Sequence, residues 1–144
     1  MTKAGAAGLM GNLKAYSGIR SVFYENAYKK KIGLSDQEYV DQVGFGLALW
    51  TYHTRKQALF NTCRENIGSL DCQLKYLVAE LKAYFSKLNQ LLRSSSDVRT
   101  CTIGVIVDFE RPLSMTQAAK NRRISSAMEY FNGYWRNKDI IFIK

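Results

Sequence analysis

The 144-residue sequence has few of the residues that cross-link or interrupt a small protein: one proline, one histidine and three cysteines. Cys63, Cys72 and Cys101 form no Cys-x-x-Cys pair, and together with His53 they lack the spacing of a usual zinc site. We therefore expect no metal and no cofactor. The odd number of cysteines predicts buried thiols that stay reduced in a reducing compartment.

Long apolar runs are also missing. The run at residues 103–107 is far shorter than the roughly 20 residues that cross a bilayer, so we expect no membrane span. Near the N-terminus, Lys3 precedes a stretch of small residues that resembles a signal peptide. Gly5 and Gly8 dilute this stretch and Lys14 ends it, so we expect no signal peptide.

What the sequence does contain is enough apolar material for one packed domain. Hydrophobic residues make up 47% of the chain and charged residues 23%. A domain of this size buries about 68–70% of the surface of its unfolded chain, which suffices for a core without cross-links. Lysine and arginine number 21 against 12 acidic residues, and the resulting net charge of +9 favours anionic partners.

Helical periodicity runs along most of the chain and predicts a single all-α domain over residues 1–144. The expected helices cover residues 3–16, 35–42, 54–66, 69–84, 85–92, 98–109 and 114–135. Segment 98–109, with Asp97 as its N-cap, is rich in β-branched residues, but its length favours a buried helix over a strand. Residues 138–144 form an apolar tail that either packs back onto the core or docks as a short strand.

Two helices have faces that can be assigned from the pattern. In helix 69–84 the apolar positions are expected to face the core and the charged ones solvent; the former are Leu70, Leu74, Leu77, Val78 and Leu81, the latter Lys75, Glu80 and Lys82. In helix 114–135, capped by Ser114, we expect Ala118, Ile124, Ala127, Met128 and Phe131 to face inward and Lys120, Arg122 and Arg123 to form a basic outer patch. In the first helix, glycines indicate close packing against a neighbouring helix.

Three segments carry a resemblance to a known family. They read GLMGNLKAYSG at residues 8–18, GFGLALWT at residues 44–51 and DFERP at residues 108–112. In this order they resemble the phage tail lysozymes, and the similarity extends through residues 55–59 and 73–77 to cover nearly the whole chain. The resemblance implies a helical lysozyme-like fold with a saccharide cleft, distantly related to goose-type lysozymes and soluble lytic transglycosylases.

The chain departs from the family pattern at the catalytic acid. The resemblance places a glutamate, in a pattern of the type G-N-x-x-x-E-S, where this chain has Tyr16 followed by Ser17. Glycoside cleavage needs a carboxylic acid that protonates the leaving oxygen, and a phenol, with a pKa of about 10, is a much weaker donor. The family also has glutamine at the position of Leu49, and the connector before Gly44 is shorter than in relatives.

Other residues near these motifs have two interpretations. Trp50 and Tyr52 resemble a platform on which a sugar ring stacks, although Trp50 is equally suited to core packing. Glu25 is a candidate replacement for the missing acid, or a solvated charge. Glu110 is interpreted as a structural anchor at a helix end, and His53 as a surface or capping residue rather than the partner of a nucleophilic cysteine.

These observations lead to the hypothesis of a catalytically inactive lysozyme-like protein of phage or mobile-element origin. It would act in the bacterial cytoplasm as a binding protein or inhibitor, for example against a defence complex such as CRISPR-Cas. An acidic protein or nucleoprotein would contact a basic surface formed by Lys29, Lys30, Lys31, Arg122 and Arg123. The alternatives are a peptidoglycan glycosidase that uses Glu25 and a cell-wall-binding module that does not cleave. The pattern leaves the oligomeric state open.

Overall fold

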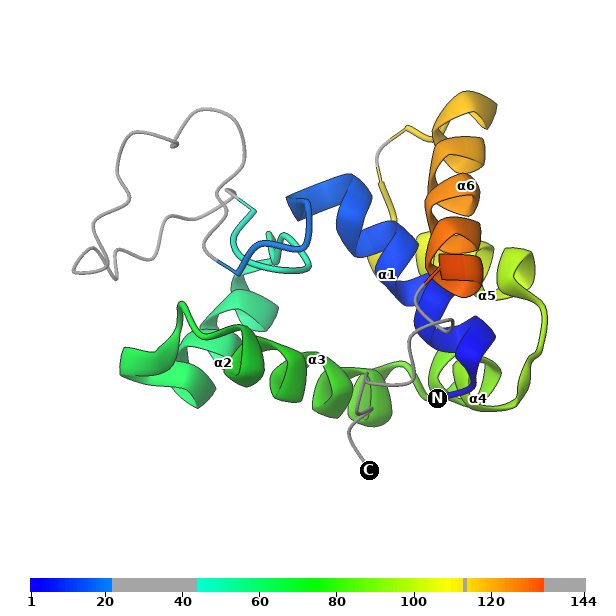
Figure 1. Ribbon diagram of the computed structural model, residues 1–144. Coiled ribbons are helices and arrows are strands. Elements are labelled where there is room, and N and C mark those ends of the chain that lie inside the picture. Colours follow the sequence, from blue (N-terminus) through cyan, green and yellow to red (C-terminus); the bar gives the residue numbers. More distant parts are fainter. Residues whose placement is uncertain (22–43, 113, 134–144) are drawn as a thin grey trace. The chain divides into compact units, whose positions relative to one another are not determined.

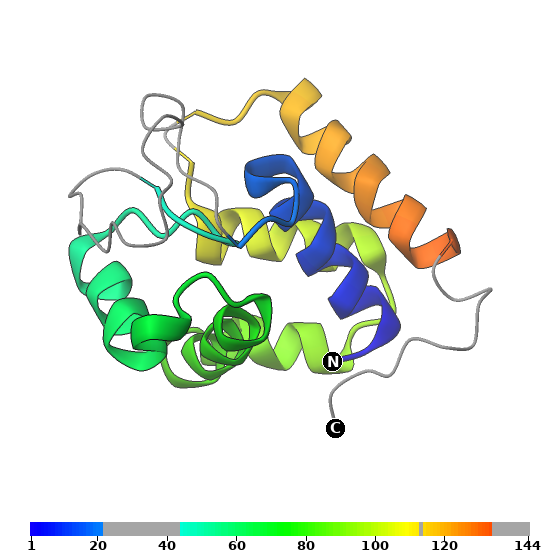
Figure 2. The ribbon, with the colours of Figure 1, turned by 60° about the vertical axis from the view of Figure 1, so that its left-hand side comes forward.

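The computed structural model describes residues 1–21, 44–112 and 114–133, and within these residues the fold is all-α, as predicted (Figures 1 and 2). Its elements are α1 (Lys3–Ser17), α2 (His53–Cys63), the 3-10 turn η2 (Arg64–Asn66), α3 (Leu70–Tyr84), α4 (Ser86–Ser94), α5 (Val98–Gly104), the π-helical η3 (Val105–Glu110) and α6 (Gln117–Gly133). Among the described residues, extended pairing is limited to one antiparallel bridge between Phe45 and Trp50. No described helix is long and apolar enough to cross a membrane.

Several predictions from the sequence concern residues outside the described ranges. They are the helix at 35–42, the candidate acid Glu25, the basic cluster of Lys29, Lys30 and Lys31, and the apolar tail at 138–144. These stay predictions.

The chain forms two compact units. One combines residues 1–15 with the chain from Phe85 onward, and the other runs from Tyr16 to Tyr84. Helix α1 belongs to both, because its last two residues, Tyr16 and Ser17, are the first residues of the second unit. The candidate site residues Tyr16, Ser17, Leu49, Trp50 and Tyr52 therefore all lie in the Tyr16–Tyr84 unit.

In the first unit, the glycines of α1 allow the close helix packing that the sequence predicted. Figures 1 and 2 both show α1 running beside α5 and α6. A methyl group at Gly11 would lie 2.7 Å from the Cβ atom of Ala127 in α6, and one at Gly8 would lie 2.8 Å from the Cβ atom of Cys101 in α5. Side chains larger than hydrogen would therefore push these helices apart.

The β-branched segment that begins at Val98 is a helix, as its length predicted. Asp97 caps it, accepting hydrogen bonds from the backbone N–H groups of Arg99 at 3.2 Å and Thr100 at 2.9 Å. Cys101, Val105 and Phe109 are buried along its length. Burial of this apolar face outweighs the weak preference of β-branched residues for strands.

The buried face of α3 differs from the predicted one. Leu77 and Leu81 are buried as predicted, but Glu80 is 3% exposed, whereas Leu70 and Val78 are 42% and 38% exposed. The prediction of an outward Glu80 and inward Leu70 and Val78 was wrong. The helix is rotated toward its polar side because Glu80 and Gln73 have buried hydrogen-bond partners, described below.

The predicted faces of α6 also need correction. Ile124 and Ala127 are buried, but Met128 and Ala118 are exposed. Thr116, not Ser114, caps the helix, since its hydroxyl accepts a hydrogen bond from the backbone N–H of Ala119 at 3.1 Å.

The prediction of three reduced thiols was wrong for two of them. Cys63, the last residue of α2, and Cys72, in the first turn of α3, form a disulfide with their Cα atoms 5.9 Å apart. The turn between the helices brings these residues within bonding range, which spacing along the chain does not reveal. Cys101 is a free, buried cysteine, as predicted.

Candidate functional site

The end of α1 carries the position at which the family resemblance expects the acid. Tyr16 is partly buried there and Ser17 is fully buried. The Ser17 hydroxyl donates a hydrogen bond to the carbonyl oxygen of Leu47 at 2.7 Å. Gly18 and Ile19 then turn the chain away with φ angles of 62° and 59°. The first motif is thus joined to the second through Ser17.

The second motif forms a tight loop at residues 44–51. Two backbone hydrogen bonds join Phe45 and Trp50, at 3.2 Å and 2.9 Å between nitrogen and oxygen, and a third runs from the Leu49 N–H to the Gly46 carbonyl at 3.1 Å. Leu49 is partly exposed and has a φ of 45°, a left-handed conformation that is unfavourable for leucine. Residues in strained conformations cluster at functional sites, and Leu49 occupies the position at which the family resemblance implies glutamine.

The side chain of Gln73 in α3 holds this loop by hydrogen bonds. Its Oε1 atom accepts a hydrogen bond from the Leu47 N–H at 2.8 Å, while Nε2 donates to the carbonyl oxygens of Ser21 at 2.8 Å and Ile67 at 2.5 Å. A methyl group at Gly46 would lie 2.7 Å from Oε1. One buried amide thus joins three loops, a role that the sequence pattern alone does not reveal.

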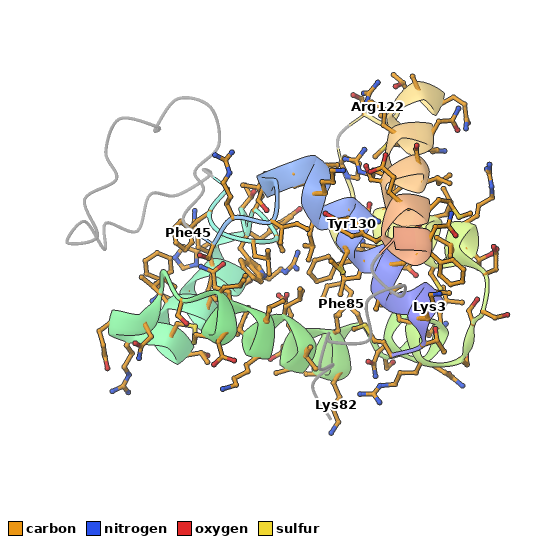
Figure 3. The ribbon with its side chains drawn as sticks, in the orientation of Figure 1. Lys3, Phe45, Lys82, Phe85, Arg122 and Tyr130 are labelled. Carbon is orange, nitrogen blue, oxygen red and sulfur yellow. A yellow bond between two sulfur atoms is a disulfide. The ribbon has the colours of Figure 1, made fainter. Side chains whose placement is uncertain are left out.

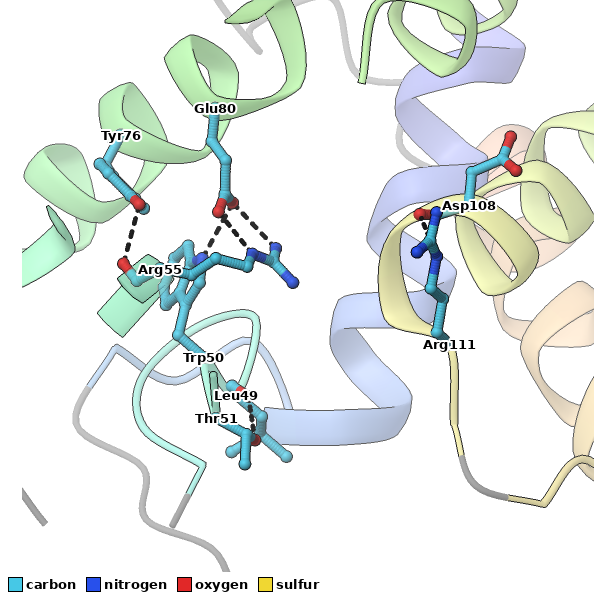
Figure 4. A network of polar contacts seen from close by, with 8 residues as sticks. All are labelled: Leu49, Trp50, Thr51, Arg55, Tyr76, Glu80, Asp108 and Arg111. Atoms are coloured by element: carbon cyan, nitrogen blue, oxygen red, sulfur yellow. Dashed lines mark hydrogen bonds and ion pairs between the residues drawn. The ribbon is translucent and has the colours of Figure 1, made fainter. Parts of the chain in front are cut away.

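Trp50 is part of a buried polar network (Figure 4). Its indole is 1% exposed, and Nε1 donates a hydrogen bond to Glu80 Oε2 at 3.0 Å. Arg55 binds the same carboxylate with two donors, Nε to Oε1 at 2.6 Å and Nη2 to Oε2 at 2.9 Å. Both Glu80 oxygens are therefore occupied, and the indole of Trp50 lies in the core, where it cannot stack on a sugar.

Tyr76 completes the network. Its hydroxyl donates a hydrogen bond to the Arg55 carbonyl oxygen at 2.8 Å, and its ring packs edge-on against Trp50 with centroids 5.5 Å apart. Burial, reinforced by the negative charge of Glu80, raises the pKa of Tyr76 to about 12. The network joins α2, α3 and the 44–51 loop.

Two other predicted site residues lie at the surface. Tyr52 is 77% exposed and directly precedes α2, and His53 is the exposed first residue of that helix. Of the stacking pair suggested by the sequence, the structure therefore leaves only Tyr52 available to a ligand.

The basic patch predicted on α6 is smaller than expected. Arg122 is exposed and is labelled in Figure 3, but Arg123 is 9% exposed. The Arg123 guanidinium lies against its own helix, with Nη1 3.4 Å from the Ala119 carbonyl oxygen and 3.5 Å from the Met115 sulfur. The prediction that Arg123 points outward was wrong, because the long side chain folds back over the helix surface.

The third motif ends the helical segment in the first unit. Arg111 has a left-handed φ of 44°, its N–H donates to the Ile106 carbonyl at 2.9 Å, and its Nε donates to the Asp108 carbonyl at 3.1 Å. Glu110 is partly buried at this end. The DFERP motif thus has a clear structural use as a helix terminus.

Carboxylates that could replace the missing acid are few in the described part of the Tyr16–Tyr84 unit. They are Glu65, Asp71 and Glu80. Glu65 is exposed, and Asp71 forms an exposed ion pair with Lys75. Over all described residues, no group of three histidine, cysteine, aspartate or glutamate side chains is placed to hold a metal ion.

Comparison of the sequence with known protein families identifies the family of this chain. Residues 1–134 match the sequence model of the phage tail lysozymes. The chain belongs to the phage tail lysozyme family. No curated protein and no solved structure matches it. The match places the chain in a peptidoglycan-related family, and its helical fold fits a lysozyme-like domain.

Hydrogen bonds join the motifs of the described site, but the end of α1 carries no carboxylate. Ser17, Leu47 and Gln73 hold the first two motifs together by hydrogen bonds. At the position where the family resemblance expects glutamate, this phage tail lysozyme homologue presents the phenol of Tyr16.

Proposed function

We propose that this member of the phage tail lysozyme family does not cleave peptidoglycan and acts as a binding protein. The observation that carries the proposal is Tyr16 at the end of α1, next to Ser17, whose hydroxyl donates a hydrogen bond to the Leu47 carbonyl oxygen. General acid catalysis contributes about 10²- to 10⁴-fold to such reactions, and a phenol is a poor source of it near neutral pH.

The remaining carboxylates of the described site support the proposal. Glu80 is buried, but its two oxygens already accept hydrogen bonds from Arg55 and Trp50. Glu65 and Asp71 are exposed to solvent, and Asp71 pairs with Lys75, whereas the catalytic acid of a glycosidase lies in apolar surroundings.

The partner that we propose is an acidic protein or nucleoprotein in the bacterial cytoplasm, such as a defence complex. The net charge of +9 supports an anionic partner. Arg122 on α6 is the exposed member of the predicted basic surface that falls within the described residues. Peptidoglycan is a less favoured partner, because the indole of Trp50 is buried and leaves Tyr52 as the remaining member of the predicted stacking pair.

The test of catalysis is digestion of purified peptidoglycan, followed by analysis of the released muropeptides. We expect no release by the parent protein. Tyr16→Phe, which keeps the ring, and Glu25→Gln serve as controls that separate the two candidate groups. Release by the parent that is lost in Glu25→Gln would identify a relocated acid and overturn the proposal.

The test of binding uses three defined probes: a polyglutamate peptide, duplex DNA and purified peptidoglycan. We expect binding to an acidic probe that weakens as salt rises, because screened charges attract less. Arg122→Glu is expected to weaken this binding more than the matched change Lys87→Glu on α4. Retention by peptidoglycan alone would favour a wall-binding module.

A further inference from the structure

The disulfide lies next to Gln73, whose side chain holds the 44–51 loop. Cys63 is the last residue of α2, Cys72 lies in the first turn of α3 directly before Gln73, and the two cysteines are nine positions apart in the sequence. The closed loop contains Ile67, whose carbonyl oxygen accepts a hydrogen bond from Gln73 Nε2. The same Gln73 side chain binds the Leu47 N–H. The bridge and the 44–51 loop are therefore linked through one amide.

Apart from the bridge, the turn between α2 and α3 is held by hydrogen bonds and by the buried side chain of Ile67. Arg64 holds a left-handed φ of 45°, and Arg64, Glu65 and Asn66 are exposed. Two local backbone hydrogen bonds close the turn, from Ile67 to Arg64 at 3.0 Å and from Ser69 to Asn66 at 2.8 Å. The Ser21 hydroxyl also donates to the Gly68 carbonyl oxygen at 2.7 Å, beside the bond from Gln73 to Ile67. An exposed turn with a strained residue opens readily, and a covalent link limits this opening.

The rest of the unit is also held by contacts that do not involve the two cysteines. Leu47, Leu59 and Leu77 are fully buried, and the ion pair of Arg55 with Glu80 joins α2 to α3 independently of the cysteines. Loss of the bridge is therefore expected to loosen the α2–α3 turn and the loop held by Gln73 while the unit stays folded.

We propose that Cys63 and Cys72 form a reversible thiol–disulfide couple that sets the order of the 44–51 loop. When the couple is reduced the two thiols are free and the loop is loose; when it is oxidised the bridge closes and the loop is held. The inference goes beyond the proposed binding function and does not rest on it.

The oxidant in this couple is a low-molecular-weight disulfide such as glutathione disulfide. The thiolate of Cys72, which is partly exposed, attacks the glutathione disulfide and forms a mixed disulfide while one glutathione thiolate leaves. The thiolate of Cys63, which is 2% exposed, then attacks the Cys72 sulfur and expels the second glutathione thiolate. Two electrons pass to glutathione disulfide, and the two protons released by the cysteines yield two molecules of reduced glutathione.

The size of the effect follows from loop closure. For a loop of this length, the chain-entropy model predicts that the closed disulfide lowers the equilibrium constant for opening of the turn by about a hundredfold. Part of this effect is lost because the open turn keeps some contacts, so we expect the Leu47 amide to exchange its hydrogen at least about tenfold faster in the reduced protein.

The experiment is amide hydrogen exchange on the full chain, equilibrated either with glutathione disulfide or with a phosphine reductant. Thiol counts after denaturation should be one in the oxidised protein and three in the reduced one. We expect faster exchange of the Leu47 amide on reduction, and no change for the Cys101 amide, which donates to the Asp97 carbonyl in the other unit.

Two variants control the experiment. Cys63→Ser/Cys72→Ser should exchange like the reduced parent under both conditions, and Cys101→Ser should respond like the parent. Because the parent itself is compared in two redox states, the test does not depend on these variants folding. Equal Leu47 exchange in the oxidised and reduced parent, or three thiols remaining after equilibration with glutathione disulfide, would overturn the proposal.

Discussion

Replacing Glu80 by glutamine tests how far the buried network stabilises the Tyr16–Tyr84 unit. The side chain of Glu80 is 1% exposed and that of Arg55 is 25% exposed. Glutamine has one oxygen where Glu80 uses two, and its amide N–H₂ would face a donor. Removing one partner from a buried ion pair destabilises a protein by about 3–5 kcal/mol. Because Arg55 can turn partly toward water, we expect a loss of about 2–3 kcal/mol.

The measurement is urea unfolding followed by tryptophan fluorescence in a Trp135→Phe background, so that Trp50 reports on its own unit. With a urea dependence of about 1–3 kcal/mol per molar, the unfolding midpoint should fall by about 1–2 M. A typical domain has a free energy of unfolding of about 5–15 kcal/mol, so the variant is expected to stay folded without denaturant.

Two further variants sharpen this test. Lys75→Met removes an ion pair with Asp71 in which both side chains are 69% exposed, and it should change stability by less than about 0.5 kcal/mol. Arg55→Met combined with Glu80→Gln should be more stable than the sum of the single losses predicts, because no buried charge is left unpaired. If Glu80→Gln alone stays within about 0.5 kcal/mol of the parent, the assignment of the network as a main stabilising element is refuted.

Three other changes probe separate features. Leu49→Asn should stabilise the protein by about 1 kcal/mol in urea unfolding, because asparagine tolerates the left-handed φ of 45° better than leucine, and an unchanged midpoint would show that the loop is unstrained. Gly11→Ala should destabilise by about 1–3 kcal/mol, since its methyl group would lie 2.7 Å from Ala127 Cβ; a thermal melt that matches that of an exposed control, Gly133→Ala, would contradict the packing of α1 on α6. The pKa of Tyr76 is raised to about 12, so the folded state favours the neutral phenol; the stability that this contributes is present below pH of about 10 and is lost as pH rises toward 12. Tyr76→Phe should flatten this alkaline loss in stability measured from pH 8 to 12, and an unchanged slope would assign the loss to other groups.

The candidate site was predictable in part from the sequence. The motifs around Tyr16 and Trp50 could be recognised because the residues of each motif are neighbours in the chain. Gln73 and Glu80 were missed in their roles, although one signal was present: Gln73, Leu77 and Leu81 are four residues apart and share a helix face. A polar residue on a face with two buried leucines indicates a buried hydrogen-bond partner, but it does not say which group that partner is.

The sequence by itself determined where α1, α3 and the helix beginning at Val98 form, because helical periodicity and the Asp97 cap act over only a few residues. Tertiary structure alone decided that Glu80 of α3 is buried and that Cys63 bonds Cys72. Each of these depends on a partner brought close by folding: Arg55 for Glu80, and the end of α2 for the start of α3 at the disulfide. Burial makes a polar group depend on its partner, and the position of that partner is a property of the folded chain.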